Sequence, residues 1–455
     1  MGRRRNLPSI RQSASIISAV RSRRQSMFEV DWQTPHLWRK TAQTRTTAPR
    51  LSGDHHTDVL VVGGGFTGMA AALGARDCGL NVVLLEGNEI GSAASGRNNG
   101  LVISHHSKAS PSEFEKVYGK PLGERYNRMV ADAAGVAFGL MQRFNIDAHQ
   151  VQEGWIQPAH TEKTLERARQ FHDEWKAFGA NVSWLDRDDV SARIGSPYLG
   201  GWMVHNSGHI NPFAMTIGLA DALEREGVRI FENSRATRIE RIATGWRVLT
   251  TSGSVTAPEV ILATNALTED IWPGLKRTLI PFKVFQAATP PLSEELRAQI
   301  LVGNPAVSDM RNDLRYFHYD CDNRLVSGAT HSLWFDEAQR GRAKVAQMLG
   351  KAFKAFGGPP EVDEYWHGTF AVVPDRQPRL YRLAPGLVFG GIYSGRGVAL
   401  SMSLGQELGR WAAGKSSDDQ MPLPVTSMKP IPLHALAVQT ANKMHAWHRL
   451  KDRLG

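Results

Sequence analysis

Cysteine is nearly absent from this chain, with only Cys78 and Cys321 among 455 residues. The two form no Cys-x-x-Cys pair and cannot build a metal cluster, so no metal is expected. Such low usage fits a reducing, cytoplasmic compartment. Long apolar runs are also missing. Because no stretch of about 18 uncharged apolar residues occurs, no membrane span is predicted.

Acidic side chains are missing from residues 1–26, which carry seven arginines. Without these arginines the net charge of +10 falls to +3, so the basic character is local and nucleic-acid binding by the body of the protein is not expected. We interpret the segment as a disordered extension, or as sequence upstream of a true start at Met27. A transit peptide for an organelle, and an arm that binds nucleic acid or lipid, are the alternatives.

Apolar residues are plentiful, at 42%, and charged residues make up 22% of the chain. This balance is typical of a packed globular core. A length of 455 residues exceeds one ordinary domain and fits two interleaved domains.

The first informative motif is a glycine-rich turn that follows an apolar strand. The run Val59–Val62 leads into Gly63, Gly65 and Gly68, which have the spacing Gly-x-Gly-x-x-Gly. The first glycine permits a tight turn, the second lets a pyrophosphate approach the backbone, and the third lets a helix pack close to the sheet. Free N–H groups at the start of that helix attract phosphate. The motif predicts dinucleotide binding, and the alternative is a glycine-rich turn in an ordinary parallel sheet.

A second strand indicates which dinucleotide is bound. Val82–Leu85 is apolar and ends at Glu86, 18 residues after Gly68, where a carboxylate can accept hydrogen bonds from a ribose. An acid here disfavours NADP, whose 2′-phosphate usually meets a cation. Residues 91–100 form another small, polar, glycine-rich loop. A flavin needs this longer cradle, so FAD is favoured over NAD.

Four separate motif segments occur along the chain: Gly91–Gly100, Val260–Ala266, Trp366–Pro378 and Gly390–Val398. In this order they resemble the FAD-dependent D-amino-acid oxidase superfamily, the glycine oxidase-like flavoenzymes, and most closely its γ-glutamylputrescine oxidase branch. The resemblance covers roughly residues 31–432. Asn99 and Pro374 stand where the family usually has glycine and threonine.

The resemblance implies an α/β fold, α+β overall, in which a discontinuous FAD-binding Rossmann-like domain is interleaved with an antiparallel-sheet substrate domain. The expected FAD-binding segments are 57–110, 205–270 and 366–414, and the expected substrate-domain segments are 111–204 and 271–365. Residues 27–56 are expected to form an irregular N-terminal arm, and residues 415–455 a tail whose helix spans 433–454.

The resemblance also implies which residues hold FAD. They come from the glycine turn, the acid that follows it, the second loop and the C-terminal motif: Gly63, Gly65, Phe66, Thr67, Gly68, Glu86, Ser95, Gly96, Arg97, Asn98, Ala236, Thr264, Gly391, Ser394, Gly395, Gly397 and Val398. The helix that begins at Val398 would direct its N-terminus at the pyrimidine side of the flavin, where the reduced ring is anionic.

The implied reaction is oxidation of a C–N bond by hydride transfer to the flavin, giving an imine that hydrolyses to an aldehyde or oxoacid. The implied substrate is an amine or amino acid such as γ-glutamylputrescine, an N-alkyl amino acid, glycine or a D-amino acid, with O2 or another electron acceptor. We expect catalytic roles for Tyr393, Arg396, His367 and Tyr316, and Arg396 or Arg315 could pair with a carboxylate. Further candidates for the lining of the site are His105, Trp155, His209, His318, Tyr319 and Trp334.

Two other functions remain open from the sequence. An RNA-modifying flavoprotein domain is suggested only by the basic N-terminus and predicts salt-dependent tRNA binding that is lost when residues 1–26 are removed. A flavin-bound protein without turnover predicts a flavin absorbance that no amine bleaches.

Overall fold

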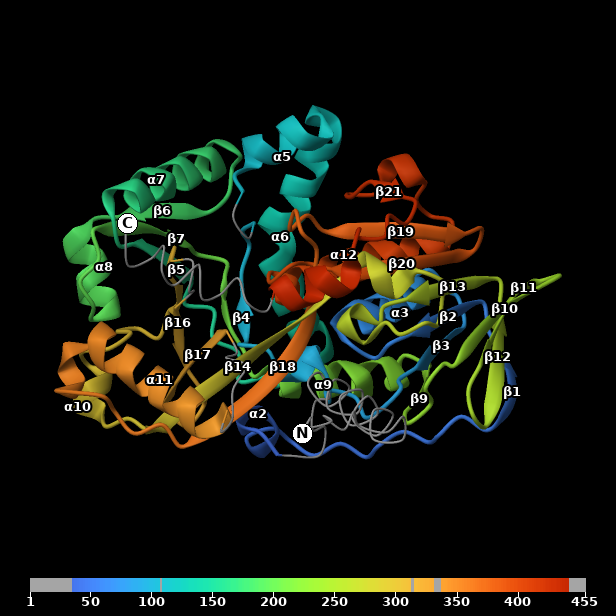
Figure 1. Cartoon of the computed structure of the whole chain (residues 1–455), viewed down its shortest axis with the longest axis horizontal. Helices are drawn as coiled ribbons and strands as arrows, with labels where there is room; N and C mark the ends of the chain where they lie inside the picture. Colours follow the sequence, from blue (N-terminus) through green and yellow to red (C-terminus); the bar gives the residue numbers. More distant parts are fainter. Residues whose placement is uncertain (1–34, 107–108, 312–314, 331–336, 442–455) are drawn as a thin grey trace, which may run out of the picture.

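The computed structural model describes residues 35–106, 109–311, 315–330 and 337–441, so the extension 1–26 and Trp334 lie outside the described residues. Two large sheets organise this part of the chain (Figure 1). The seven-stranded sheet lies in the right half of that view and the eight-stranded sheet in the left half. The predicted α/β class, with one domain interleaved in the other, is confirmed.

The seven-stranded sheet has a parallel centre in which β9, β3, β2, β13 and β20 run the same way. Its edge strand β19 is antiparallel to β20, and β21 follows beyond it. All residues of the central strands β2 and β3 are buried, as their continuous apolar sequences predict. In sheet order the strands are β21 (Val425–Thr426), β19 (Arg379–Ala384), β20 (Leu387–Ile392), β13 (Glu259–Leu262), β2 (Val59–Val62), β3 (Val82–Leu85) and β9 (Arg229–Phe231).

Alternate residues of these strands enter two different cores. Val59 and Val61 pack with the helices α3 (Phe66–Asp77), α9 (Pro212–Arg225) and α12 (Gly397–Ala412). Leu60 and Val62 pack on the other face against a small sheet. That sheet has the order β1 (Gly53–His56), β12 (Gly253–Ala257), β11 (Gly245–Leu249) and β10 (Arg238–Ile242).

Helices α3 and α12 approach each other closely along their small residues. A Cβ atom at Gly409 would lie 2.2 Å from the carbonyl oxygen of Ala71, and one at Gly405 would lie 2.6 Å from that of Thr67. Only glycine allows two backbones to come this near. The contact joins the first nucleotide-binding helix to the last helix of the predicted FAD-binding domain.

The eight-stranded sheet is antiparallel as predicted, except that β5 and β15 are parallel. One face belongs to the same core as α3 and α12, and the other packs against α8 (Arg187–Ile194) and α11 (Glu337–Ala352). In order, its strands are β18 (Glu364–Val372), β14 (Ile280–Pro291), β17 (Arg324–Thr330), β16 (Tyr316–Tyr319), β15 (Ala306–Ser308), β5 (Trp155–Ala159), β7 (Gly200–Val204) and β6 (Val182–Leu185).

The remaining elements are short or lie at the outside of the two sheets. Strands β4 (Leu101–Val102) and β8 (Gly208–His209) form a separate two-stranded pair. The other helices are α2 (Leu37–Lys40), α4 (Ala94–Arg97), α5 (Pro111–Tyr118), α6 (Lys120–Phe144), α7 (Glu162–Ala177) and α10 (Glu294–Arg297). Short 3-10 turns occupy η1 (Asn265–Leu267), η2 (Leu275–Thr278), η3 (Lys354–Phe356) and η4 (Asp418–Gln420).

Two expectations about element placement need correction, and a third is met as far as the structure describes it. Strand β18 was expected to begin the last FAD-binding segment, but it pairs with β14 at the edge of the eight-stranded sheet. The arm is not irregular throughout, because it contains α2 and because β1 pairs with β12. In the tail, residues 434–441 are helical, and the rest of the expected helix lies outside the described residues.

The N-terminal arm is fastened to the body by a buried ion pair. Arg45, only 6% exposed at its side chain, donates from Nη1 to Glu232 Oε2 at 2.6 Å. Glu232 also accepts from the backbone N–H of Ala48 and of Ile90, at 2.5 and 2.6 Å. These bonds connect the arm, the end of β9 and the loop after Glu86.

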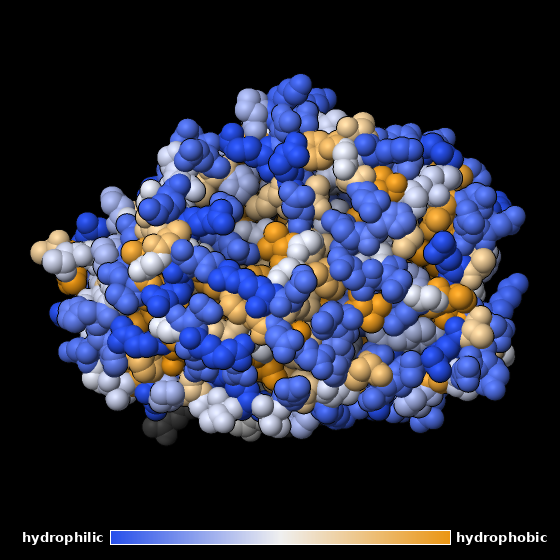
Figure 2. Space-filling model, turned by 180° about the vertical axis from the view of Figure 1, so that it is seen from behind, coloured by the Kyte–Doolittle hydropathy of each residue, from blue (hydrophilic) through white to orange (hydrophobic). Residues whose placement is uncertain are grey.

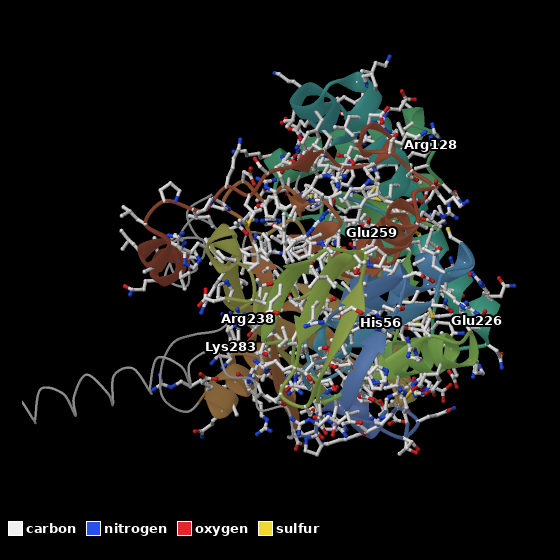
Figure 3. All side chains as sticks on the ribbon, turned by 90° about the vertical axis from the view of Figure 1, so that its right-hand side faces the viewer. His56, Arg128, Glu226, Arg238, Glu259 and Lys283 are labelled. Carbon is white, nitrogen blue, oxygen red and sulfur yellow. The ribbon has the colours of Figure 1, made fainter. Side chains whose placement is uncertain are left out.

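On the face in Figure 2, hydrophobic residues appear as small scattered groups among hydrophilic ones. Of the residues labelled in Figure 3, Arg128 on α6, Glu226 after α9 and Arg238 on β10 are exposed. Among the described helices, none combines the length and hydropathy needed to cross a bilayer.

We expect Arg45→Met to lower the free energy of unfolding by about 3 kcal/mol, because it leaves the buried Glu232 carboxylate without its cation. Arg39→Met removes the exposed pair with Glu89 and should cost at most about 1 kcal/mol. Urea unfolding of the full chain measures both. Equal losses in the two variants would contradict the structural role of the Arg45 pair.

Candidate cofactor and substrate site

A cavity of about 700 Å³ lies between the two large sheets. One end is lined by the glycine turn after β2 and by Glu86 after β3, and the other by Tyr316 on β16 and Arg396 before α12. The carboxyl ends of the parallel strands open into this cavity, the usual position for a ligand in such a sheet.

The glycine turn has the conformation that its sequence predicts. Gly63 has a φ of +113°, and a Cβ atom there would lie 2.7 Å from the carbonyl oxygen of Ala263. Gly65 is the N-cap of α3 and supplies no side-chain cap. The first N–H groups of α3 therefore lie at the cavity wall, and that of Phe66 donates to Ser95 Oγ at 3.0 Å.

Glu86 closes the same end of the cavity. Its carboxylate accepts from the backbone N–H groups of Gly64 and Asn88, each at 2.8 Å. Burial raises the pKa of Glu86, although the two backbone hydrogen bonds oppose that shift. These two bonds hold the Glu86 carboxylate at the edge of the cavity, where it could also accept a hydrogen bond from a ribose hydroxyl.

Two polar contacts join the segments at the middle of the cavity. The hydroxyl groups of Thr67 on α3 and Tyr393 after β20 lie 2.9 Å apart. Asn265, with a φ of +44°, accepts from the N–H of Ala371 at 2.8 Å and donates to the carbonyl of Gly391. The Asn265 amide therefore links β13, β18 and β20 at the place where the two sheets meet.

Arg396 brings a positive charge to the other end. Its guanidinium carbon lies 5.0 Å from the centre of the Trp155 ring, and Trp155 in turn donates from Nε1 to Ser308 Oγ at 2.9 Å. No carboxylate among the described residues pairs with Arg396. Burial lowers the pKa of Arg396 to about 10, so the side chain is still charged at pH 7.

Most residues predicted to hold the cofactor line this cavity. The lining includes Gly63, Gly65, Phe66, Thr67, Glu86, Ser95, Arg97, Asn98, Ala236, Thr264, Ser394, Gly395, Gly397 and Val398. Gly68, Gly96 and Gly391 are not part of the lining. They lie behind it, and a Cβ atom at Gly68 or Gly96 would meet a backbone oxygen at 1.9 or 2.1 Å.

Tyr316, Tyr393 and Arg396 line the cavity as expected, but His367 does not. His367 pairs with Phe285 on β14, so its side chain leaves the sheet on the face that packs against α11. Only its backbone carbonyl reaches toward the site, where it accepts from Arg97 Nε at 2.9 Å. The expected catalytic role of His367 is therefore not supported.

The further lining candidates are also corrected. His105, Trp155, His209, His318 and Tyr319 are buried and absent from the cavity wall. His105 accepts from Trp175 Nε1 at 2.9 Å within an aromatic cluster, and Trp155 contacts the lining residues Arg396 and Ser308 from behind. Arg315 lies outside the lining as well. The histidines, the tryptophan and the tyrosine among these candidates are residue types that suit a binding site, but here they are buried in the core.

Sequence reasoning missed Gln286, Thr330, Arg311 and Asn265 among the lining residues. The missed signal was the period of β14, where Ile280, Phe282, Val284 and Gln286 all line the cavity at alternate positions. Gln286 is the polar member of this otherwise apolar series, and a polar residue at such a position indicates the face of the strand that meets a ligand.

Parallel strands ending at a glycine turn and an acid, with a second sheet across the same cavity, define a two-domain dinucleotide-dependent oxidoreductase. The family described as FAD dependent oxidoreductase matches residues 58–411. The chain belongs to this family, the D-amino-acid oxidase family.

A similar relative is the γ-glutamylputrescine oxidoreductase of Escherichia coli (strain K12), which is 30% identical over 88% of this chain and 93% of the relative. Among solved structures, glycine oxidase from Geobacillus kaustophilus has a TM-score of 0.67 at 22% identity, covering 83% of this chain and 100% of its own. L-amino acid deaminase from Proteus vulgaris has a TM-score of 0.68 at 17% identity, covering 84% of this chain and 99% of its own. At these identities the structural likeness concerns the fold.

The buried histidines should make stability depend on acid pH. Burial lowers the pKa of His106 and of His209 to about 3. Between pH about 6.5 and about 3 the unfolded chain binds these protons and the native chain does not, so stability falls as the pH is lowered, by about 1.4 kcal/mol per unit for each histidine.

The measurement is urea unfolding at pH 7.5, 6.5 and 5.5. In His209→Gln the loss between pH 6.5 and 5.5 should be smaller than in the wild type by the contribution of one histidine. A wild-type stability that stays constant over this range would contradict the prediction.

Proposed function

We propose that the cavity binds FAD in an extended conformation and that the protein oxidises a C–N bond of a carboxylate-bearing amine or amino acid. The observation that carries this proposal is the continuity of the cavity from the Gly63–Gly68 turn to Arg396. A dinucleotide turn at one end and, at the other, a cation with no carboxylate partner among the described residues fit a cofactor and an anionic substrate that share one space.

The residues present fit FAD. The backbone at Gly65 is open to the cavity without a side chain, which suits a pyrophosphate at the start of α3. The carboxylate of Glu86 suits a ribose. The N-terminus of α12, with Gly397 and Val398 in the lining, suits a ring that becomes anionic when reduced.

Bound FAD would supply the hydride acceptor, which no protein side chain can replace. The protein contributes placement and charge. Arg396 would bind a substrate carboxylate through two N–H donors, and its guanidinium carbon lies 5.0 Å from the centre of the Trp155 ring, which supports it from the sheet. The Thr67–Tyr393 contact holds the segment before α12 in place, so Tyr393 acts as a positioning residue.

The cavity wall also limits which substrates fit. Its only carboxylates among the described lining residues are Glu86 and Glu269. Glu86 bonds its own turn, and Glu269 pairs with Arg235 at 2.8 Å. A polycationic amine would find no free anion at the Arg396 end. The likeness to γ-glutamylputrescine oxidoreductase supports an amine that also carries a carboxylate, and we propose O2 or another acceptor for reoxidation.

We expect Gly65→Ala to weaken FAD binding at least tenfold, because a methyl group would occupy the floor of the cavity, 2.9 Å from Ser95 Oγ. Flavin fluorescence titration of the apoprotein gives the dissociation constant. Gly135→Ala is the matched control, since nothing lies within 4 Å of the added methyl group. FAD affinity in Gly65→Ala equal to that of the control would contradict the proposed cradle.

The reaction is tested by anaerobic titration of the FAD-loaded protein with γ-glutamylputrescine, sarcosine, glycine and D-amino acids, followed by the flavin absorbance. At least one should bleach the flavin. For that substrate, Arg396→Met should raise KM by about 100-fold through loss of the carboxylate contact. Arg410→Met on the exposed side of α12 is the control and should leave KM unchanged. A yellow protein that none of these compounds reduces would contradict the proposed activity.

A further inference from the structure

The arm segment, residues 45–51, lies against the two loops that form the Glu86 end of the cavity. The β3 loop, residues 86–90, follows β3, and the β9 loop, residues 232–236, follows β9. In Figure 1 the arm passes below β9 on its way from α2 to β1. The two loops contribute Glu86, Gly87, Asn88, Arg235 and Ala236 to the lining.

Backbone hydrogen bonds join the two loops to each other. The N–H of Ser234 donates to the carbonyl of Glu86 at 2.8 Å, and the N–H of Asn233 donates to the carbonyl of Asn88 at 2.9 Å. The loops therefore form one unit at this end of the cavity.

The side chain of Glu232 ties this unit to the arm. It is 2% exposed and accepts from donors on both sides. From the arm, Arg45 Nη1 and the N–H of Ala48 donate to its Oε2 at 2.6 and 2.5 Å. From the β3 loop, the N–H of Ile90 donates to its Oε1 at 2.6 Å. Because one buried carboxylate receives all three bonds, the place of the β3 loop depends on the arm.

Ser234 makes a second connection between the arm and the loops. Its hydroxyl oxygen accepts from the N–H of Leu51 at 2.8 Å, and the same hydroxyl donates to the carbonyl of Glu232 at 2.8 Å. Ser234 and Leu51 are both buried. Since the N–H of Ser234 also bonds the backbone of Glu86, a single residue lies between the arm and the carboxylate proposed for the ribose.

The chemistry of this end suits the adenosine half of FAD. Glu86 is placed to accept from a ribose hydroxyl, and the lining beyond it consists of the two loops. Loops are ordinarily the more mobile parts of a binding site, and a loop that must become ordered when a ligand binds lowers the affinity. Hydrogen bonds that already order both loops raise the affinity for the ligand they receive.

We propose that the arm segment is a structural part of the cofactor site and holds the two loops in the arrangement that receives the adenosine half of FAD. Arg45, Glu232 and Ser234 are positioning residues, since none of them lines the cavity. This inference rests on the proposed binding of FAD. It gives a role to a segment that lies outside residues 58–411, which the family model matches.

The first test uses the wild-type full chain and the reciprocity of coupling: if the arm favours FAD binding, bound FAD must stabilise the arm. Hydrogen exchange at the backbone amides of Ala48 and Leu51 is measured with and without FAD. The amide of Val190, which donates to the Asp186 carbonyl in α8, is the reference for global stabilisation. Relative to that reference, FAD should slow exchange at both arm amides about tenfold.

The second test compares FAD with FMN, which carries the same ring and one phosphate but no adenosine. Ser234→Ala removes the acceptor of the Leu51 N–H and should weaken FAD binding about fivefold and FMN binding less than about twofold. Ser252→Ala is the matched control. It removes a 2.8 Å bond to the carbonyl of the same Leu51, but from the turn between β11 and β12, and should keep both affinities.

Arg45→Met examines the ion pair in the same way. It should weaken FAD about tenfold and FMN less than about twofold, because Glu232 loses the cation that places it. Arg143→Met breaks a pair with Asp77 at the end of α3 that is remote from the glycine turn, and it should leave both affinities unchanged. Flavin fluorescence titration of each apoprotein gives the dissociation constants.

Arm amides that respond to FAD no more than Val190 overturn the proposal. So do Ser234→Ala and Arg45→Met variants that bind FAD like the wild type, or that lose FAD and FMN equally. The exchange experiment needs no variant, so it decides even if a variant fails to fold. A protein that binds no FAD contradicts the proposed function, whereas one that binds FAD without protecting the arm contradicts this inference alone.

Discussion

The structure depends on the close approach of backbones that only glycine permits around the first nucleotide-binding helix. The turn at Gly63 presses against the end of β13, and α12 lies against α3 along Gly405 and Gly409. These contacts bring segments from the beginning, middle and end of the chain to one edge of the parallel sheet. The cavity exists at that edge because no side chains fill it.

The second sheet supplies the other wall through the simple alternation of strand side chains. On β14, even-numbered positions face the cavity and odd-numbered positions such as Phe285 enter the core against α11. The same rule aligns Trp155, Tyr316 and Gln286 on one face. Arg396, at the start of α12, meets this sheet through the ring of Trp155, so the cation at this end of the cavity packs against a strand.

The dinucleotide end was predictable from sequence, because its determinants are local. The spacing of Gly63, Gly65 and Gly68 and the acid at Glu86 each have a meaning within a single strand–turn–helix unit. His367 shows the limit of this reasoning. It lies inside a family-like motif, yet the register between β14 and β18 turns its side chain away from the cavity and presents only its carbonyl to Arg97.

The sequence by itself determined the class of fold, the cofactor turn and the order of the segments that return to it, because glycine spacing and apolar strands act over short distances. Only the tertiary structure decided which polar residues share a wall. Gln286, Gly328 and Tyr316 are brought together by strand register between distant segments, and no local pattern records that register. The same reason explains why His105, His209, His318 and Trp155, whose residue types looked suited to a site, are core.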